Sequence, residues 1–305
     1  MLSRRLAIAI AIAAVSLAGP VRAHAQQPVK EPVKVLATFS ILADFVRNVG
    51  GDRVDAGALV GPDSDAHVYS PAPADARRLA DAQIVVMNGL GYEGWMARLI
   101  KASGSKAQPV VATAGIKPRR QADAHGHSHG GTDPHAWQSV ANVKQYVVNI
   151  RNALIKADPD GRGIYQANAE AYAAKLDTLD AEVRAMVETI PRDRRKIITS
   201  HNAFGYFQQA YGVEFIAAQG VSTESEASAK DVARIITQIR RQKIPAVFLE
   251  NVSDPRLMQR IAQESGARIG GKIYSDALTG PGGDAPTYID MIRYNIRQIA
   301  AALTG

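Results

Sequence analysis

The chain has 305 residues, of which 46% are hydrophobic and 21% charged, and its formal net charge is +7. This is an ordinary globular composition, long enough for two modest domains or one large one. No basic run is interleaved with aromatic residues, so the positive charge does not make nucleic acid an expected partner. The absence of cysteine excludes disulfides and thiolate metal ligands.

The first 25 residues have the pattern of a secretory signal peptide. Arg4 and Arg5 precede an apolar run at residues 6–19, and Ala23 and Ala25 form a small-x-small cleavage site. The run is shorter than the roughly 20 residues that span a bilayer, so we expect cleavage rather than a retained anchor. Cleavage removes three arginines and no acid, and no cysteine can carry a lipid. We therefore expect a soluble, unanchored monomer in a bacterial periplasm.

The first half of the mature chain alternates short apolar runs with helical patterns. Such alternation predicts a mostly parallel sheet with helices on both faces. The run at residues 84–87 is continuously apolar and ends at Asn88 and Gly89, which is typical of a strand buried on both faces. The predicted strands are residues 33–38, 54–60, 84–87 and 110–112, and the predicted helices are residues 41–49, 73–82, 95–102 and 139–156.

A long uninterrupted helix is predicted at residues 165–188, where apolar residues recur at spacings of three and four. Its roughly 24 residues would extend about 36 Å, enough to bridge two lobes. We expect an N-terminal α/β lobe at residues 26–160, a linking helix at 161–190 and a C-terminal α/β lobe at 191–305. The second half repeats the alternation, with strands at residues 196–199, 214–216, 246–249 and 273–274 and helices at 203–211, 230–243, 256–265 and 287–303.

Three histidines and one acid occupy equivalent places in this pattern. His67 follows the second predicted strand, His201 and Asp276 follow strands of the second half, and His135 precedes a helix. Ligands of open α/β sheets bind beyond the carboxyl ends of the strands, and three imidazoles with one carboxylate complete a tetrahedral metal shell. The alternative for each histidine is a polar cap or a core residue.

Residues 125–137 hold four of the seven histidines of the chain. His125, His127 and His129 alternate with glycine and serine, a composition typical of a metal-attracting tract. We expect this tract to be an accessory to the fixed site, within a loop at residues 121–132. The alternative is a solvated linker with no role in metal capture.

Five segments of the chain resemble the zinc/manganese-type (cluster A-I, or cluster 9) solute-binding proteins of bacterial ABC metal importers. They are residues 65–73, 133–137, 200–206, 222–228 and 274–276. The resemblance covers the mature chain and implies two α/β lobes joined by one long rigid helix. It places the metal in the cleft between the lobes, on His67, His135, His201 and Asp276. Ala66 and Ala227 stand where the family usually has proline, which affects loop rigidity more than metal ligation.

The resemblance points to the zinc-specific branch, because manganese-selective members have a carboxylate at the position of His201. Imidazole in place of an oxygen ligand favours Zn²⁺ over the harder Mn²⁺, although Cu²⁺ and Ni²⁺ bind the same donors. The implied function is capture of Zn²⁺ and delivery to an ABC permease, without enzymatic activity. An accessory zinc chaperone is a further possible partner. Alternatives are a zinc hydrolase and an adhesin or metallochaperone that acts without a permease.

Several neighbours of the candidate ligands have a supporting role in this hypothesis. Glu250 and Asp133 are candidates to orient the histidines through hydrogen bonds, with an ordinary structural role as the alternative. The aromatic residues that could enclose the site, or only pack in the core, are Trp137, Phe204 and Tyr206. Glu224 and Glu226 are candidates for the surface that docks to a permease, with an ordinary solvated loop as the alternative.

Overall fold

The computed structural model describes residues 31–120, 131–224 and 226–305. The predicted signal peptide and the histidines at positions 125, 127 and 129 lie outside the described residues. Pro32–Gly305 form one compact unit that holds both halves of the predicted fold. Within the described residues, no helix combines the length and apolar character that crossing a membrane requires.

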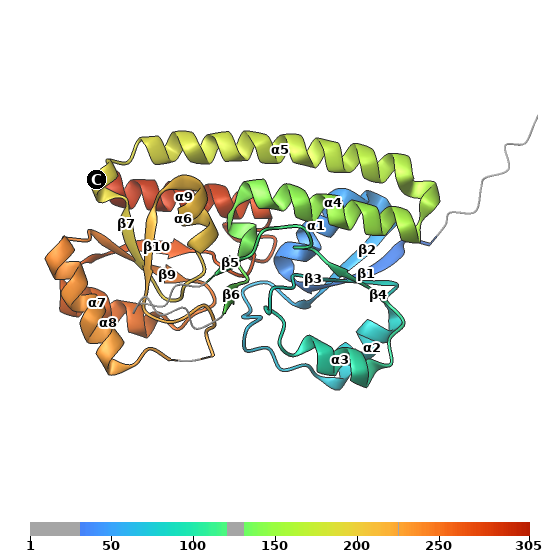
Figure 1. Ribbon diagram of the computed structural model, residues 1–305, viewed down its shortest axis with the longest axis horizontal. Coiled ribbons are helices and arrows are strands. Elements are labelled where there is room, and N and C mark those ends of the chain that lie inside the picture. Colours follow the sequence, from blue (N-terminus) through green and yellow to red (C-terminus); the bar gives the residue numbers. More distant parts are fainter. Residues whose placement is uncertain (1–30, 121–130, 225) are drawn as a thin grey trace, which may run out of the picture. The chain divides into compact units, whose positions relative to one another are not determined.

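The N-terminal sheet contains four parallel strands in the order β2-β1-β3-β4 (Figure 1). Its strands are β1 (Val33–Phe39), β2 (Val54–Val60), β3 (Ile84–Met87) and β4 (Gln108–Val111), and its helices are α1 (Ser40–Gly50), α2 (Pro73–Asp81) and α3 (Met96–Ser103). β1 leads to β2 on one side, whereas β3 leads to β4 on the other. The connections therefore diverge between β1 and β3, where open α/β sheets form a ligand crevice.

The C-terminal sheet has the same plan, with parallel strands in the order β10-β9-β7-β8. Its elements are β7 (Lys196–Thr199), α6 (Gly205–Tyr211), β8 (Glu214–Ala217), α7 (Ala229–Gln242), β9 (Ala246–Glu250), α8 (Pro255–Ser265), β10 (Arg268–Ile273) and α9 (Tyr288–Thr304). Here the connections diverge between β7 and β9. The predicted alternation of strands and helices, and with it the α/β fold class, is confirmed.

Of the strands that the sequence predicted, the last one differs most from its expected bounds. It was expected at residues 273–274, but β10 spans Arg268–Ile273, with a register irregularity against β9 between Ile269 and Lys272. Gly270 and Gly271 make this strand difficult to predict from the sequence, because glycine is depleted from strands. Gly271 also has a φ of +126°. The hydrogen-bonded pairing with β9 produces the strand despite this unfavourable composition.

Helix α5 (Arg162–Glu188) has 27 residues, about 40 Å at 1.5 Å per residue. In Figure 1 it runs past both sheets, and it packs on α1, α9 and α4 (Val140–Ala157). Its buried stripe includes Tyr165, Tyr172, Leu176 and Leu179, at the spacing expected of one helix face. The lobe boundaries near residues 160 and 191 stay a prediction.

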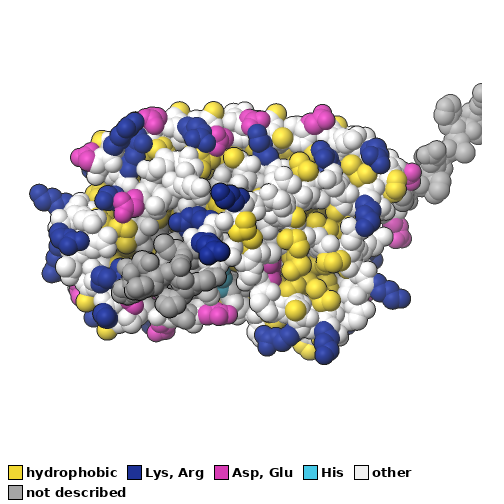
Figure 2. All heavy atoms as spheres, in the orientation of Figure 1, with side chains coloured by type: hydrophobic (Ala, Val, Ile, Leu, Met, Phe, Trp, Pro, Cys, Tyr) yellow, Lys and Arg dark blue, Asp and Glu magenta, His cyan; other side chains and the backbone are white. Residues whose placement is uncertain are grey.

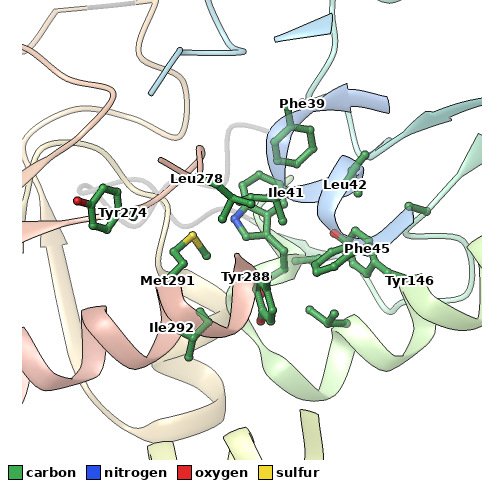
Figure 3. Packing of buried hydrophobic residues seen from close by; sticks show 14 of the residues in the cluster. Phe39, Ile41, Leu42, Phe45, Tyr146, Tyr274, Leu278, Tyr288, Met291 and Ile292 are labelled. Carbon is green, nitrogen blue, oxygen red and sulfur yellow. The ribbon is translucent and has the colours of Figure 1, made fainter. Parts of the chain in front are cut away.

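One hydrophobic core continues through both halves of the compact unit. Figure 3 shows Phe45 of α1 and Tyr146 of α4 in the same cluster as Tyr288 and Met291 of α9. The ring of Phe45 lies 5.0 Å from that of Tyr288 and 5.7 Å from that of Tyr146. Because interiors are close-packed, such a shared core restricts relative movement of the two sheets. It thereby supports a site whose residues come from both.

Candidate metal centre

Four buried side chains from four separate loops meet between the two sheets. His67 lies in the loop after β2, His135 precedes the short 3-10 turn Ala136–Gln138, His201 follows β7 and Asp276 follows β10. Each offers one ligand atom, and these atoms all lie within 4.8 Å of one another. His67 is the most exposed of the four, at 8%, whereas the other three are fully buried.

The separations between these atoms suit a single metal ion. Nε2 of His67 lies 3.2 Å from Nε2 of His135 and 3.2 Å from Oδ2 of Asp276. Nε2 of His201 lies 3.1 Å from the same Asp276 oxygen. Tetrahedral bonds of 2.0–2.1 Å would place neighbouring ligand atoms about 3.3 Å apart. The cluster therefore has the size of a metal shell before any ion is added.

Asp133 orients His135. Its Oδ1 accepts hydrogen bonds from Nδ1 of His135 at 2.9 Å and from the His135 backbone N–H at 3.0 Å. A carboxylate only accepts, so Nδ1 carries the proton and Nε2 is free to bind a metal. Arg119 donates to the other Asp133 oxygen at 3.0 Å. Gly205 leaves space for this pair, since any Cβ there would collide with both side chains.

Glu250 lies against His201 in a similar position, but this contact is a close approach of opposite charges without hydrogen-bond geometry. Oε2 of Glu250 lies 2.6 Å from Nδ1 of His201, and its Oε1 accepts the backbone N–H groups of Ser200 at 2.7 Å and His201 at 3.0 Å. The ring is thus held with Nδ1 toward Glu250 and Nε2 toward Asp276. Glu250 ends β9 and His201 follows β7, so the pair occupies the point where the connections of the C-terminal sheet diverge.

Opposite charges shift the pKa values within the site. Burial by itself lowers the pKa of His201, but the negative charges of Glu250 and Asp276 outweigh burial and raise this pKa well above 6.5. Burial raises the pKa of Asp276, yet the adjacent His201 and His135 bring it well below its usual range. The site therefore stabilises positive charge among buried carboxylates, as a cation-binding centre requires.

The loop that carries Asp276 is fixed from the opposite half of the molecule. The carbonyl oxygen of Ser275 accepts hydrogen bonds from Nε1 of Trp137 at 2.9 Å and Nε2 of Gln138 at 2.8 Å. The backbone N–H of Leu278 donates to Oγ of Ser40 at 3.0 Å. Asp276 is thereby held between two backbone positions that the N-terminal half restrains.

Residues 35–302 match the family model of the periplasmic component A of the zinc-uptake complex. The chain belongs to this family. It is 35% identical over 275 residues to the manganese-binding lipoprotein MntA of Halalkalibacterium halodurans, covering 90% of this chain and 89% of that protein. It is 34% identical to the iron-binding protein YfeA of Yersinia pestis, covering 88% of this chain and 85% of the relative.

The solved structure of the periplasmic zinc binding protein TroA from Treponema pallidum has the same fold. It superposes with a TM-score of 0.84 at 32% identity, covering 90% of this chain and 100% of that one. The chain is thus a metal-binding, substrate-binding protein of ABC-type metal uptake. The relatives are named for manganese, iron and zinc, so membership of the family does not identify the metal.

Tyr92, which was not among the predicted site residues, forms part of the wall of the site. The ring of Tyr92 lies 4.7 Å from that of His67, 6.1 Å from that of His135 and 5.1 Å from that of Trp137. Burial raises the pKa of Tyr92 well above its usual range, and the charges of Asp276 and Asp65 raise it further. The only sequence feature that could have indicated this role is the position of Tyr92 in a Gly-rich loop after β3.

The three aromatic residues named as candidates to enclose the site, or only to pack in the core, have different roles. The ring of Trp137 lies 5.2 Å from that of His135, so it does adjoin a candidate ligand. Phe204 instead stacks on Phe215, with ring centroids 4.6 Å apart, as an ordinary core residue. The hydroxyl of Tyr206 accepts the backbone N–H of Arg119 at 2.8 Å, which places it behind Asp133.

The loop that carries His67 makes a polar contact with the C-terminal half. Oδ1 of Asp65 accepts the backbone N–H of His67 at 2.8 Å, and its Oδ2 accepts the hydroxyl of Thr223 at 2.5 Å. Glu224 and Glu226 are exposed in the same C-terminal loop. Histidine covers only a small area of the face shown in Figure 2. The contact between Asp65 and Thr223 therefore joins the His67 loop to the C-terminal half.

Proposed function

We propose that this protein binds Zn²⁺ in the periplasm through His67, His135, His201 and Asp276 and delivers the ion to an ABC permease. The supporting observation is the convergence of three imidazoles and one carboxylate in a buried space of ionic size. Two of the imidazoles are oriented by carboxylates, an arrangement that raises ligand basicity at metal sites.

The donor set supports zinc over manganese. Imidazole is a softer donor than a carboxylate or water, and three imidazoles suit Zn²⁺ better than Mn²⁺, which prefers oxygen. A tetrahedral shell with four protein donors is also the usual arrangement of closed zinc sites. Cu²⁺ and Ni²⁺ bind the same donors, so their exclusion would depend on geometry and on their supply.

The same closed shell supports binding over hydrolysis. A catalytic zinc site typically has three protein ligands and an open position for water. Here Asp276 is the candidate for the fourth position, and it is fully buried beside His201. Release would then follow loop movement around His67 rather than chemistry at the ion. The tract at His125, His127 and His129 is proposed as an accessory for capture, and Glu224 and Glu226 as part of the permease-docking surface.

Metal analysis of purified protein tests this proposal. We expect one equivalent of zinc to remain after dialysis, and Zn²⁺ to displace Mn²⁺ in competition. His201→Glu should raise the affinity for Mn²⁺ relative to Zn²⁺, since it introduces an oxygen donor. A chain without residues 125–129 is the matched control, because it removes three histidines and should keep the tight site. Preferential retention of manganese by the unmodified protein would refute the zinc assignment.

Transport is tested separately in cells. A strain without this protein should grow poorly when zinc is limiting, and the intact gene should restore growth whereas the Asp276→Ala variant should not. Normal growth of the deletion strain, with tight zinc binding retained in vitro, would favour a metallochaperone or adhesin that acts without a permease.

A further inference from the structure

We propose that Tyr92 determines metal specificity by engaging Oδ1 of Asp276 in the metal-loaded protein, directly or through one water, so that only Oδ2 binds the ion. The inference rests on the proposed function, because it concerns the carboxylate of the same site. Tyr92 would act as a positioning residue through Asp276.

The backbone of the Tyr92 loop is held rigidly. Glu93 is 7% exposed, and its Oε1 accepts the backbone N–H of Asn88 at 2.6 Å and the hydroxyl of Thr38 at 2.7 Å. Its Oε2 accepts the backbone N–H of Gly89 at 3.1 Å, and the N–H of Tyr92 donates to the Gly89 carbonyl at 3.1 Å. These hydrogen bonds fix the backbone position from which the Tyr92 side chain extends.

The ring of Tyr92 is held equally closely. It is 3% exposed and packs between Phe39, with ring centroids 5.0 Å apart, and Trp137, with centroids 5.1 Å apart. One edge contact with the His67 ring, at 4.7 Å, places it against the metal site. A buried ring enclosed on these sides has little rotamer freedom, so its hydroxyl is directed to one place.

Several buried polar atoms of this site lack hydrogen bonds within the part of the chain that the structure describes, and for two of them, Nδ1 of His201 and Oε2 of Glu250, the explanation is their mutual contact at 2.6 Å. Among the described residues, neither the hydroxyl of Tyr92 nor Oδ1 of Asp276 has a hydrogen-bond partner. One is a donor and the other an acceptor. Unpaired buried polar groups are unfavourable, and each requires an explanation. Asp276 is also the charged group that acts most strongly on the Tyr92 phenol. Joining the two atoms satisfies both.

The two oxygens of Asp276 have different surroundings. Oδ2 lies 3.2 Å from Nε2 of His67 and 3.1 Å from Nε2 of His201, so it faces the ion position. Oδ1 is farther from the nearest imidazole nitrogen, 3.6 Å from Nε2 of His135. An engaged Oδ1 keeps the carboxylate monodentate and the shell four-coordinate, which suits Zn²⁺. A released Oδ1 would permit bidentate binding and the higher coordination number that harder ions accept.

Tyr92→Phe removes the hydroxyl and keeps the ring. Tyr172→Phe is the matched control, because the Tyr172 hydroxyl is also buried without a hydrogen-bond partner among the described residues, but it lies in α5 beside Phe45. The measurements are Zn²⁺ and Mn²⁺ affinities by chelator competition, the visible absorption of the Co²⁺-loaded protein, and the melting temperature of each metal-free variant.

We expect Tyr92→Phe to lower the ratio of zinc to manganese affinity by about tenfold and to weaken the Co²⁺ absorption bands, as a change from four to five ligands does. Tyr172→Phe should change neither. An unchanged ratio and spectrum in folded Tyr92→Phe would overturn the inference, as would equal weakening of both metals. If unmodified protein binds zinc and His201→Ala does not reduce that binding, the proposed site itself fails.

Discussion

Glu250→Gln probes how the structure prepares His201 for a metal. Glutamine keeps the length of the side chain, and its carbonyl oxygen can still accept the backbone N–H groups of Ser200 and His201 that now bond to Glu250 at 2.7 and 3.0 Å. Its amide NH₂ would then face Nδ1 of His201, where a carboxylate oxygen lies at 2.6 Å. A donor in that place favours the tautomer that carries its proton on Nε2, the atom that faces the ion.

The expected loss follows from these contacts. Partners that orient a metal-binding histidine typically contribute 10–100-fold in affinity, which is about 1.4–2.7 kcal/mol. We expect Glu250→Gln to lie near the upper end, because the substitution both lowers ring basicity and favours the wrong tautomer. Asp133→Asn should cost less, near tenfold, since Arg119 at 3.0 Å already neutralises part of the Asp133 charge.

Competition with a zinc chelator at pH 7 measures both losses. Asp44→Asn is the control, since Asp44 is a buried carboxylate that also accepts a backbone N–H, that of Tyr288 at 3.0 Å, but it lies in α1 and has no part in the site. It should leave zinc affinity within a few-fold of the unmodified protein. Unaltered affinity in folded Glu250→Gln, or a larger loss in Asp133→Asn than in Glu250→Gln, would refute the reasoning.

Four further outcomes are expected. Zinc affinity should fall from pH 8 to 5, because protons compete for the imidazoles, and a constant affinity would exclude them as donors. Burial opposes protonation of His201, but the charges of Glu250 and Asp276 raise its pKa in the folded, metal-free protein. Protonation of His201 therefore stabilises the metal-free fold. This stabilisation is complete below about pH 6.5 and is lost as the pH rises through the folded-state pKa. Zinc at a thousandfold excess over Kd should stabilise the protein by about 4 kcal/mol in thermal unfolding, whereas no shift relative to chelator would contradict tight binding. Thr223→Val removes the 2.5 Å bond to Asp65 and should speed zinc release several-fold in stopped-flow measurements, with Thr237→Val, on α7, as the control.

Much of the fold was evident in local sequence patterns. Strand β3 has the boundaries predicted from its continuous apolar run, and α5 differs from its prediction by three residues at its start. The four candidate ligands were recognised because each follows a strand or precedes a helix in a recurring α/β pattern. Such signals act over a few residues, and periodicity reports them directly.

Contacts between distant residues were decided only by the tertiary structure. The sequence does not distinguish Tyr92 from other aromatic residues, whereas the fold places its ring 4.7 Å from that of His67. Arg119 meets Asp133 because β5 (Arg119–Arg120) pairs with β6 (Thr132–Asp133), and Asp65 meets Thr223 across 158 positions of sequence. Local propensity determines which secondary structure a segment prefers. These contacts instead form only when the two sheets pack on one shared core. Residue order therefore indicated the candidate ligands, whereas packing determined the distances between them and the side chains that contact them.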